Sequence, residues 1–379
     1  MKIAVIGAGP AGLYFSLLAK KHDPRHEITV YEQNPQGATY GWGVVFSDIG
    51  LAFLREADPD FFGRFVAHHE RCDYMEIVHR GTRVQVQGNP FSRTSRIDML
   101  AVLERACLEA GVRIRHQQRV DDVARLAAEV DMLVAADGSN SAVRKQYADQ
   151  FRPAFERRRN KFAWYGTRQR FHPVSLIFRE AEHGIFIAHS YQYSKDLSTF
   201  LVEVDPDSWR RAGLDTASEE DSRRYCARVF GDDLGANDLL GNRSLWFEAN
   251  IVRNERWSHE NIVLLGDALR TVHFSLGSGT RMAMQDAIAL HQGLLRHPGD
   301  ARAAFAEFET LRRPASSSFQ AAAGRSLDWY ENVAAKMHLD PVAFAYDYMR
   351  RTGQVSHDDL RQRDPAFAAA YETRHAVAA

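Results

Sequence analysis

The chain has 379 residues and a mass of 42.9 kDa, and its 48 basic and 49 acidic residues give a formal net charge of -1. This balance excludes the strong positive field that gathers nucleic acid or coats an anionic membrane, and no run of about 18 uncharged apolar residues is present to span one. The three cysteines are too sparse for a disulfide scaffold or a metal site, which favours a reducing, cytoplasmic setting. We therefore expect small-molecule partners, no nucleic acid, no membrane and no metal.

The N-terminal segment has the pattern of a nucleotide-binding unit. Residues 2–6 are an apolar run typical of a buried strand, and residues 13–21 follow as a helix. Between them lies Gly-x-Gly-x-x-Gly, in which Gly7 permits the turn, Gly9 lets amides approach a pyrophosphate, and Gly12 lets helix and strand pack closely. The candidate cofactor contacts are Gly7, Gly9, Pro10, Ala11 and Gly12.

A second predicted strand, residues 27–32, ends in a carboxylate twenty residues after Gly12. An acid at this spacing is typical of a group that binds a ribose 2′-hydroxyl, so Glu32 is the predicted ribose ligand and favours FAD or NAD. The adjacent Gln33 is a candidate for the same site. A glycine turn of purely structural purpose is the alternative, and the flanking strand, helix and acid make it the weaker one.

Two later segments each place a carboxylate at the end of a predicted strand. In the first, residues 131–144, the strand is followed by an Asp137-Gly138 turn and the start of a helix. In the second, residues 262–268, the strand ends in Gly266-Asp267. A predicted helix over residues 281–294 follows, and the residues directly before it are Gly277, Ser278, Gly279 and Thr280. Ligands collect at the carboxyl ends of strands in open parallel sheets, so both segments are candidate cofactor contacts.

The region between these two segments has the aromatic and β-branched texture of antiparallel strands. The predicted strands are 162–171, 175–179, 184–193 and 199–204. Alternation along the third strand places His189, Tyr191 and Tyr193 on one face, with Ile185 and Ile187. That face can form the floor of an aromatic substrate pocket; the alternative is a cross-strand aromatic ladder that only packs.

A basic segment precedes this predicted sheet. Residues 151–171 hold seven basic residues and, as the one acidic residue, Glu156. Such a run is commonly a solvated face, but arginine forks also match phosphate geometry, so Arg158 and Arg159 are candidate phosphate contacts.

The C-terminal region has helical periodicity. Beyond residue 301, Phe305, Phe308 and Leu311 form one stripe, and Pro314 is predicted to break the helix. A further helix is expected over residues 326–337.

Taken together, the motifs at Gly7–Gly12, Asp137-Gly138 and Gly266-Asp267 resemble those of the class A FAD-dependent aromatic monooxygenases of the para-hydroxybenzoate hydroxylase type. The resemblance implies that the first motif holds the ADP half of FAD, that Asp137 lies near the pyrophosphate, and that Asp267 contacts the ribityl chain. It also implies that NADH or NADPH reduces FAD transiently and that O₂ is activated as a C4a-hydroperoxide. Arg96 matches a family arginine at a helix start, although on the residues alone it can equally be an ordinary helix-start residue.

The resemblance further implies the fold class and its division into domains. We expect an α/β Rossmann-like FAD/NAD(P)-binding three-layer fold with an inserted mixed or antiparallel β-sheet substrate domain and a helical C-terminus. The predicted FAD-binding domain comprises residues 1–80, 92–160 and 258–325. The substrate domain comprises 81–91 and 161–257, and residues 326–379 form the C-terminal segment.

Residues 41–48 and 273–280 resemble the branch that acts on CoA thioesters, such as the flavin domains of salicylyl-CoA 5-hydroxylase and 2-aminobenzoyl-CoA monooxygenase, and also the tryptophan-derivative hydroxylase of the violacein pathway. This likeness suggests an aryl-CoA substrate such as salicyloyl-CoA, with Arg158 and Arg159 as contacts to its phosphates. Trp42, Gly43 and Phe274 become candidate substrate contacts, and His273, with His189 and Tyr191, a candidate catalytic residue. A hydroxylase of a tryptophan or indole derivative and a non-catalytic FAD-binding module are the alternatives; monomer and homodimer both stay open.

Overall fold

The structure, a computed structural model, describes residues 1–38, 41–47 and 49–375, with the backbone alone at Ile49, Phe274 and His375. Its strands are β1 (Lys2–Ile6), β2 (Glu27–Tyr31), β3 (Gly43–Ser47), β4 (Glu70–Cys72), β5 (Met75–His79), β6 (Thr82–Val86), β7 (Phe91–Ser95), β8 (Arg113–Arg115), β9 (Met132–Ala135), β10 (Pro153–Thr167), β11 (Val174–Ala181), β12 (Gly184–Gln192), β13 (Ser198–Val204), β14 (Leu239–Leu240), β15 (Phe247–Asn254), β16 (Ser258–His259) and β17 (Ile262–Leu264).

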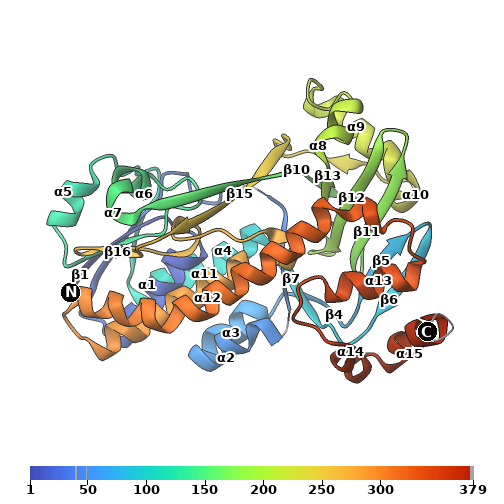
Figure 1. Ribbon diagram of the computed structural model, residues 1–379. Helices are drawn as coiled ribbons and strands as arrows, with labels where there is room; N and C mark the ends of the chain where they lie inside the picture. The colour runs from blue at the N-terminus through green and yellow to red at the C-terminus, as the bar shows by residue number, and fades with distance from the viewer. Residues whose placement is uncertain (39–40, 48, 376–379) are drawn as a thin grey trace.

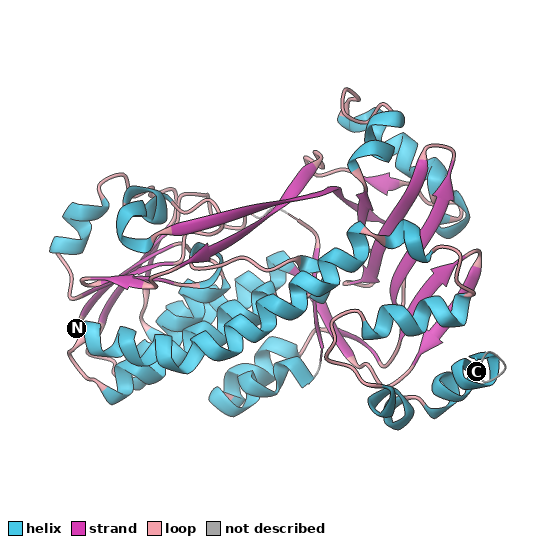
Figure 2. Ribbon diagram, viewed as in Figure 1, coloured by secondary structure: helices cyan, strands magenta, loops and turns pink. Residues whose placement is uncertain are grey.

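The helices alternate with these strands in the first part of the chain and dominate its last part (Figure 2). The α-helices are α1 (Pro10–His22), α2 (Ala52–Ala57), α3 (Pro59–Val66), α4 (Arg96–Ala110), α5 (Val123–Ala128), α6 (Ala142–Gln146), α7 (Ala148–Phe151), α8 (Pro206–Arg211), α9 (Glu219–Val229), α10 (Gly231–Leu234), α11 (Gly279–Arg296), α12 (Ala301–Glu331), α13 (Pro341–Arg350), α14 (His357–Arg363) and α15 (Pro365–His375). Short 3-10 helices are η1 (Ile49–Leu51), η2 (Gly266–Ala268), η3 (Phe274–Leu276) and η4 (Val333–Lys336).

The N-terminal part is built on a six-stranded sheet in the order β16-β17-β9-β1-β2-β8. Its central strands pair in parallel, as their nearly continuous apolar sequences predict for strands covered on both faces. Because β1, β9 and β17 are neighbours, the three motif segments that follow them leave the same edge of the sheet. The topology therefore brings the three predicted cofactor segments together.

The other large sheet has eight strands, in the order β14-β10-β13-β12-β11-β5-β6 with β15 paired to β10. One face is covered by α8, α9 and α10 and the segments that join them, and this region contributes Leu214, Cys226 and Phe230 to a buried cluster. The C-terminal helices cover part of the other face and pack Trp329 and Phe344 against it. A small third sheet, β3-β7-β4, lies between the two large ones.

Two long elements join the sheets. β10 and β15 form an antiparallel ribbon that extends from one part to the other, and α12 runs along the same direction (Figure 1). Phe305 and Phe308 of α12 lie in the core of the N-terminal part, whereas Trp329 and Tyr330 lie in the core of the C-terminal part. A single helix of 31 residues thus fixes the two cores relative to one another.

The predicted break at Pro314 is wrong, because α12 continues through it. An interior proline removes one helical hydrogen bond and costs about 3 kcal/mol in an isolated helix. α12 has buried residues on both sides of Pro314, among them Phe308 before it and Ser316 after it. The packing of these residues against the rest of the protein offsets the cost of the proline. Leu311, predicted on the buried stripe, is 37% exposed.

The predicted fold class is confirmed: a mainly parallel sheet with helices, a mixed second sheet and a helical C-terminus. The domain boundaries stay a proposal, and two strands fall differently from them. β5 pairs with β11 in the eight-stranded sheet although residues up to 80 were placed in the FAD-binding domain. β10 already begins at Pro153, so the ribbon belongs to both predicted domains.

Candidate active site

The glycine-rich loop has the close contacts that its sequence predicts. Gly7 has a φ of +106°, and a Cβ there would lie 2.3 Å from the carbonyl oxygen of Ala136. A Cβ on Gly12 would lie 2.3 Å from the carbonyl oxygen of Gly7, so only glycine lets α1 pack this closely on the turn. A Cβ on Gly9, by contrast, meets nothing within 4 Å. Gly9 precedes Pro10, the first residue of α1, and leaves the helix N-terminus open to an anion.

Glu32 lies beside this loop at the end of β2. Its carboxylate accepts a hydrogen bond from the backbone N–H of Ala8 at 3.0 Å and others from the backbone and side chain of Asn34. A cavity of about 430 Å³ opens here and is lined by residues of the loop, by Glu32 and by Arg96 of α4. Asn34 lines this cavity, whereas the predicted contact Gln33 is exposed and does not.

The Asp-Gly segment lies against the glycine-rich loop, because Ala136 is the residue that Gly7 contacts. Asp137 accepts hydrogen bonds from the backbone N–H groups of Ala142 and Val143 and so anchors the start of α6. Burial raises the pKa of Asp137 above its ordinary value. Gly138 has a φ of +81°, a backbone conformation that glycine adopts in a tight turn because it has no Cβ.

The Gly-Asp segment completes the group of motifs. Gly266, with a φ of +61°, packs against α1, since a Cβ there would lie 3.0 Å from the Cβ of Ala11. Asp267 is accessible to solvent, yet partial desolvation by the surrounding residues raises its pKa. The positive charges of Arg96 and Arg270 act in the opposite direction and lower the pKa. The charge of Arg96, which lines the cavity, thus acts on Asp267.

A buried ion-pair group lies behind Asp267. Arg270 makes two hydrogen bonds to Asp286 of α11, at 2.7 and 2.9 Å, and Arg312 of α12 donates to the same carboxylate. Asp286 is 0% exposed, so its two arginine partners compensate a fully desolvated charge. This pairing fixes α11, whose first turn contains Gly279 and Thr280, against the Gly-Asp turn.

The predicted substrate contacts gather around β3 and β12. Tyr191 donates a hydrogen bond to the carbonyl oxygen of Gly43 at 2.9 Å, and the ring of Tyr193 lies where a Cβ on Gly43 would be only 2.7 Å away. Trp42 lies against Gly166 of β10 and donates to the carbonyl oxygen of Trp164. Trp42 also accepts a hydrogen bond from the backbone N–H of Arg96, so one loop links the cofactor cavity to the substrate sheet.

His189 lies on the same face of β12 as Tyr191, as alternation predicts. Its Nε2 is 2.9 Å from a carboxylate oxygen of Glu203 on β13, and its ring lies 5.1 Å from the ring of Tyr330 of α12. Glu203 is fully buried and also accepts a hydrogen bond from Asn160.

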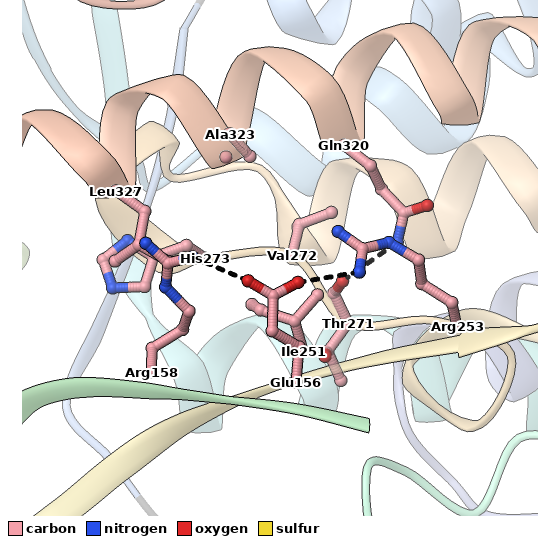
Figure 3. Close-up of a pocket in the computed structure, with 11 residues that line it drawn as sticks. Glu156, Arg158, Ile251, Arg253, Thr271, Val272, His273, Gln320, Ala323 and Leu327 are labelled. Carbon is pink, nitrogen blue, oxygen red and sulfur yellow. Dashed lines mark hydrogen bonds and ion pairs between the residues drawn. The ribbon is translucent and has the colours of Figure 1, made fainter. Parts of the chain in front are cut away.

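His273 precedes η3 and is 1% exposed. Its ring lies 5.4 Å from that of Phe162, and its other side reaches a cavity of about 20 Å³ between the β10–β15 ribbon and α12 (Figure 3). A cavity of this size holds about one water molecule. Burial, with the nearby charges of His189, Arg158 and Arg351, lowers the pKa of His273 to about 3. The side chain of the neighbouring candidate Phe274 lies outside the described part of the structure.

The loop that contains η3 is tied to the C-terminal helices. The hydroxyl groups of Ser275 and Ser326 are 3.0 Å apart, and Arg351 donates both to Ser326 and to the carbonyl oxygen of Ser275. On its other side, Gly277 has a φ of +58° and contacts Val45 of β3. The loop therefore lies between the cofactor motifs, the substrate sheet and the C-terminal helices.

Comparisons with known proteins agree with this geometry. The model of the FAD-binding domain family matches residues 69–316, which is more than half of the chain. The chain belongs to this family. It is 37% identical over 97% of its length to salicyloyl-CoA 5-hydroxylase from Streptomyces sp, of which the match covers 72%. It is also 34% identical to protodeoxyviolaceinate monooxygenase from Chromobacterium violaceum, over 93% of this chain and 94% of that protein.

Among solved structures, the tetrameric form of 2-methyl-3-hydroxypyridine-5-carboxylic acid oxygenase shares the fold, with a TM-score of 0.72 at 15% identity over 96% of this chain and 97% of that one. The predicted resemblance and the predicted cofactor, FAD, are confirmed by the family match. The residues around the cavity fit this cofactor. Gly9, Glu32 and Arg96 line one cavity, a Cβ on Gly9 would meet no atom within 4 Å, and the charge of Arg96 acts on Asp267.

The basic segment forms ion pairs that its own sequence did not predict. Arg158 is 15% exposed and pairs with three carboxylates, those of Glu156, Asp328 and Glu331. The backbone N–H of Arg159 donates to Glu331 as well. The carboxylates of α12 are remote in sequence, so the local charge count missed them. Arg158 therefore has three carboxylate partners within the protein, and its contact with a phosphate, like that of Arg159, stays a prediction.

Sequence reasoning also missed Glu203, Asn160, Tyr330 and Arg351. One signal was present, because Glu203 is a lone acidic residue within the apolar strand Thr199–Val204. A charge at a position that alternation directs into a sheet face is rarely buried unless it has a partner.

No helix among the described residues is long and apolar enough to cross a membrane.

Proposed function

We propose that the protein is an FAD-dependent, NAD(P)H-using monooxygenase that hydroxylates the ring of an aryl-CoA thioester, with salicyloyl-CoA and its 5-hydroxylation to gentisyl-CoA as the first candidate. The observation that carries the proposal is one arrangement: the loop between the Gly-Asp motif and α11 packs, through His273, on Phe162 of the eight-stranded sheet, on the face to which His189 belongs. The 37% identity to salicyloyl-CoA 5-hydroxylase supports the choice of substrate.

When bound and reduced, FAD supplies the activation of O₂ for transfer of one oxygen atom to an electron-rich ring. The protein's residues bind and orient the reactants and exclude water. Gly9, Glu32, Arg96 and Asp267 are the residues that would hold the cofactor. The aromatic face of β12, with Trp42, encloses the ring of the substrate.

A phenolic substrate becomes a better nucleophile when it loses its proton, and a histidine is a suited acceptor at neutral pH. The structure favours His189 over His273 for this role. A group whose pKa is lowered to about 3 is a weak base, whereas His189 has a buried carboxylate partner. We assign proton transfer to His189, and we assign to neutral His273 the orientation of the loop and of the bound ring.

A tryptophan or indole derivative is the second candidate substrate, supported by the 34% identity to protodeoxyviolaceinate monooxygenase over nearly the whole of both chains. A non-catalytic FAD-binding module is the weaker alternative, because both of these relatives are named as oxygenating enzymes.

The test is to load the purified protein with FAD and to supply NADH or NADPH in air with salicyloyl-CoA, free salicylate or tryptophan. Oxidation of the nicotinamide and product mass are followed together. A gain of one oxygen atom on the thioester alone supports the proposal. Hydroxylation of tryptophan alone would favour the second candidate, and no stimulation by any ring would contradict the assignment of an aromatic hydroxylase.

A further inference from the structure

A buried carboxylate, an amide and an imidazole lie together on the face of the substrate sheet that also presents Tyr191. Glu203 of β13 is opposite Ile187 of β12 and Phe162 of β10, so its side chain emerges on the face to which His189 belongs. The opposite face of the same strands packs into an apolar cluster under α9 and α10. Glu203 is therefore the one charged residue of β13 that the fold directs toward the candidate active site from the middle of the sheet.

Every oxygen of this carboxylate has a partner. One oxygen is 2.9 Å from Nε2 of His189, and the other accepts a hydrogen bond of 2.7 Å from the side-chain amide of Asn160. Within the described part of the chain, His189 is the basic group at ion-pair distance from Glu203. A fully buried carboxylate is expensive unless it is hydrogen-bonded, so this site needs an N–H at Nε2 of His189.

We propose that Glu203 is a positioning residue for the hydroxylation: it holds His189 with the proton on Nε2, and thereby leaves Nδ1 to accept the phenolic proton of the substrate. The inference rests on the proposed function. Asn160 orients the carboxylate, because a carboxylate only accepts and the amide must turn its NH₂ group toward it.

The proton transfer balances without any other reactant. The phenolic O–H bond breaks, an N–H bond forms at Nδ1, and the electron pair stays on the oxygen and enriches the ring. The imidazolium that forms is opposite the side chain of Glu203, 2.9 Å away. A carboxylate that fixes the tautomer of a histidine and stabilises its protonated form is a general arrangement in enzymes.

Other polar groups face His189 from the elements packed against it. Tyr330 of α12 lies against His189, and His189 acts electrostatically on His273 before η3. Tyr348 of α13 and Arg351 adjoin Tyr330 in turn. Burial raises the pKa of Tyr330 and of Tyr348, and it lowers that of His273 to about 3. Near neutral pH, Tyr330 and Tyr348 therefore keep their protons and His273 stays neutral.

The test compares the FAD-loaded wild type with Glu203→Gln, Glu203→Asp and a control, Glu76→Gln. Glu76 is 7% exposed and is also a strand residue of the eight-stranded sheet, but its partner is Arg83 and its side chain is on the opposite face. The tautomer of His189 is read without substrate from two-bond ¹H–¹⁵N spectra of ¹⁵N-histidine-labelled protein, with His189→Gln to assign the signal.

We expect the Nε2–H tautomer in the wild type, in Glu203→Asp and in Glu76→Gln, and the Nδ1–H tautomer in Glu203→Gln, whose amide can donate to Nε2. With salicyloyl-CoA, Glu203→Gln should lower kcat by about 10²–10⁴-fold, the range for loss of general-base catalysis, with little change in KM. Glu76→Gln should keep the wild-type kcat, and Glu203→Asp should recover part of the loss.

An Nδ1–H tautomer in the wild type, or a Glu203→Gln variant with wild-type kcat and pH profile, would overturn the inference. Failure of the proposed function is distinct from this outcome. If the wild type does not hydroxylate salicyloyl-CoA while the tautomer changes as expected, the substrate assignment fails and the positioning of His189 by Glu203 stands.

Discussion

Two glycines of the same motif should differ in how substitution by alanine affects stability, although both substitutions should weaken FAD binding. At Gly12 an added Cβ would lie 2.3 Å from the carbonyl oxygen of Gly7 and 3.0 Å from a methyl group of Val5, so α1 and the turn must separate. Overpacking of this kind costs about 1–3 kcal/mol, while alanine recovers up to about 1 kcal/mol of helix propensity. Gly12→Ala should therefore lower or leave unchanged the stability of the protein, and it should weaken FAD binding by displacing the loop.

At Gly9 the added Cβ meets no atom within 4 Å, and the backbone has a φ of -82° and a ψ of 177°, which alanine adopts without strain. The FAD-free protein should therefore be unaffected or be stabilised by about 0.4–1 kcal/mol through the unfolded state. The open space above Gly9 is where the pyrophosphate is expected, so FAD affinity should fall by roughly 10-fold or more for the loss of about one charge-assisted hydrogen bond.

Thermal unfolding of both FAD-free variants and titration of each with FAD, followed by flavin fluorescence, separate the two effects. The expected pattern for Gly9→Ala is unchanged or raised stability with weakened binding. Wild-type FAD affinity in Gly9→Ala would refute the placement of the pyrophosphate over this residue. Loss of stability in the same variant would instead refute the contacts derived for its Cβ.

Three further outcomes are expected. Asp267→Asn should weaken FAD binding about 10–100-fold, because hydrogen bonds of charged groups are worth about 1.5–3 kcal/mol. It should also raise the flavin midpoint potential, because the charge of Arg96 is then no longer opposed. An unchanged potential in spectroelectrochemical titration would contradict the electrostatic effect of Arg96 on Asp267. Arg158→Met should lower the free energy of unfolding by about 2 kcal/mol, because Glu331 is left buried. If Arg158 serves only these ion pairs, the ratio of the KM values for salicyloyl-CoA and salicylate should not change; a selective rise in the KM of the CoA ester would support the predicted phosphate contact. The pKa of His273, about 3 in the folded protein against about 6.5 unfolded, means that the unfolded chain binds one more proton between these values, so stability falls as pH drops below about 6.5. His273→Gln should make this slope shallower by about 1.4 kcal/mol per pH unit near pH 5 in denaturant unfolding, and an unchanged slope would show that the buried histidine is already charged.

The cofactor motifs could be predicted from the sequence because each depends on residues a few positions apart. The contacts of Gly7 and Gly12 are set by the strand-turn-helix geometry, which has a fixed spacing. Glu32 follows from the same spacing, and its carboxylate lies beside the loop, where it accepts a hydrogen bond from Ala8; its contact with a ribose stays a prediction. The alternation that placed His189 and Tyr191 on one face is equally local.

The rest depended on contacts between remote segments. The role of Arg158 could not be read from its neighbours, since two of its three carboxylate partners, Asp328 and Glu331, are 170 and 173 residues away. The continuation of α12 through Pro314 also depends on packing at both ends of the helix, which outweighs a local preference. Local periodicity cannot contain either fact, because each is decided by which surfaces meet in the folded chain.

The position of the η3 loop explains why cofactor and substrate residues should not behave independently. Its first residues contact the substrate face through His273 and Phe162, its middle is held by Ser326 and Arg351, and its end packs on Val45 before α11 begins. A displacement at any of these contacts therefore reaches both the N-terminus of α11 and the environment of His189. Substitutions in the C-terminal helices, remote from the glycine motifs in sequence, should for this reason alter the fraction of reduced cofactor that yields hydroxylated product, even where FAD affinity is unchanged.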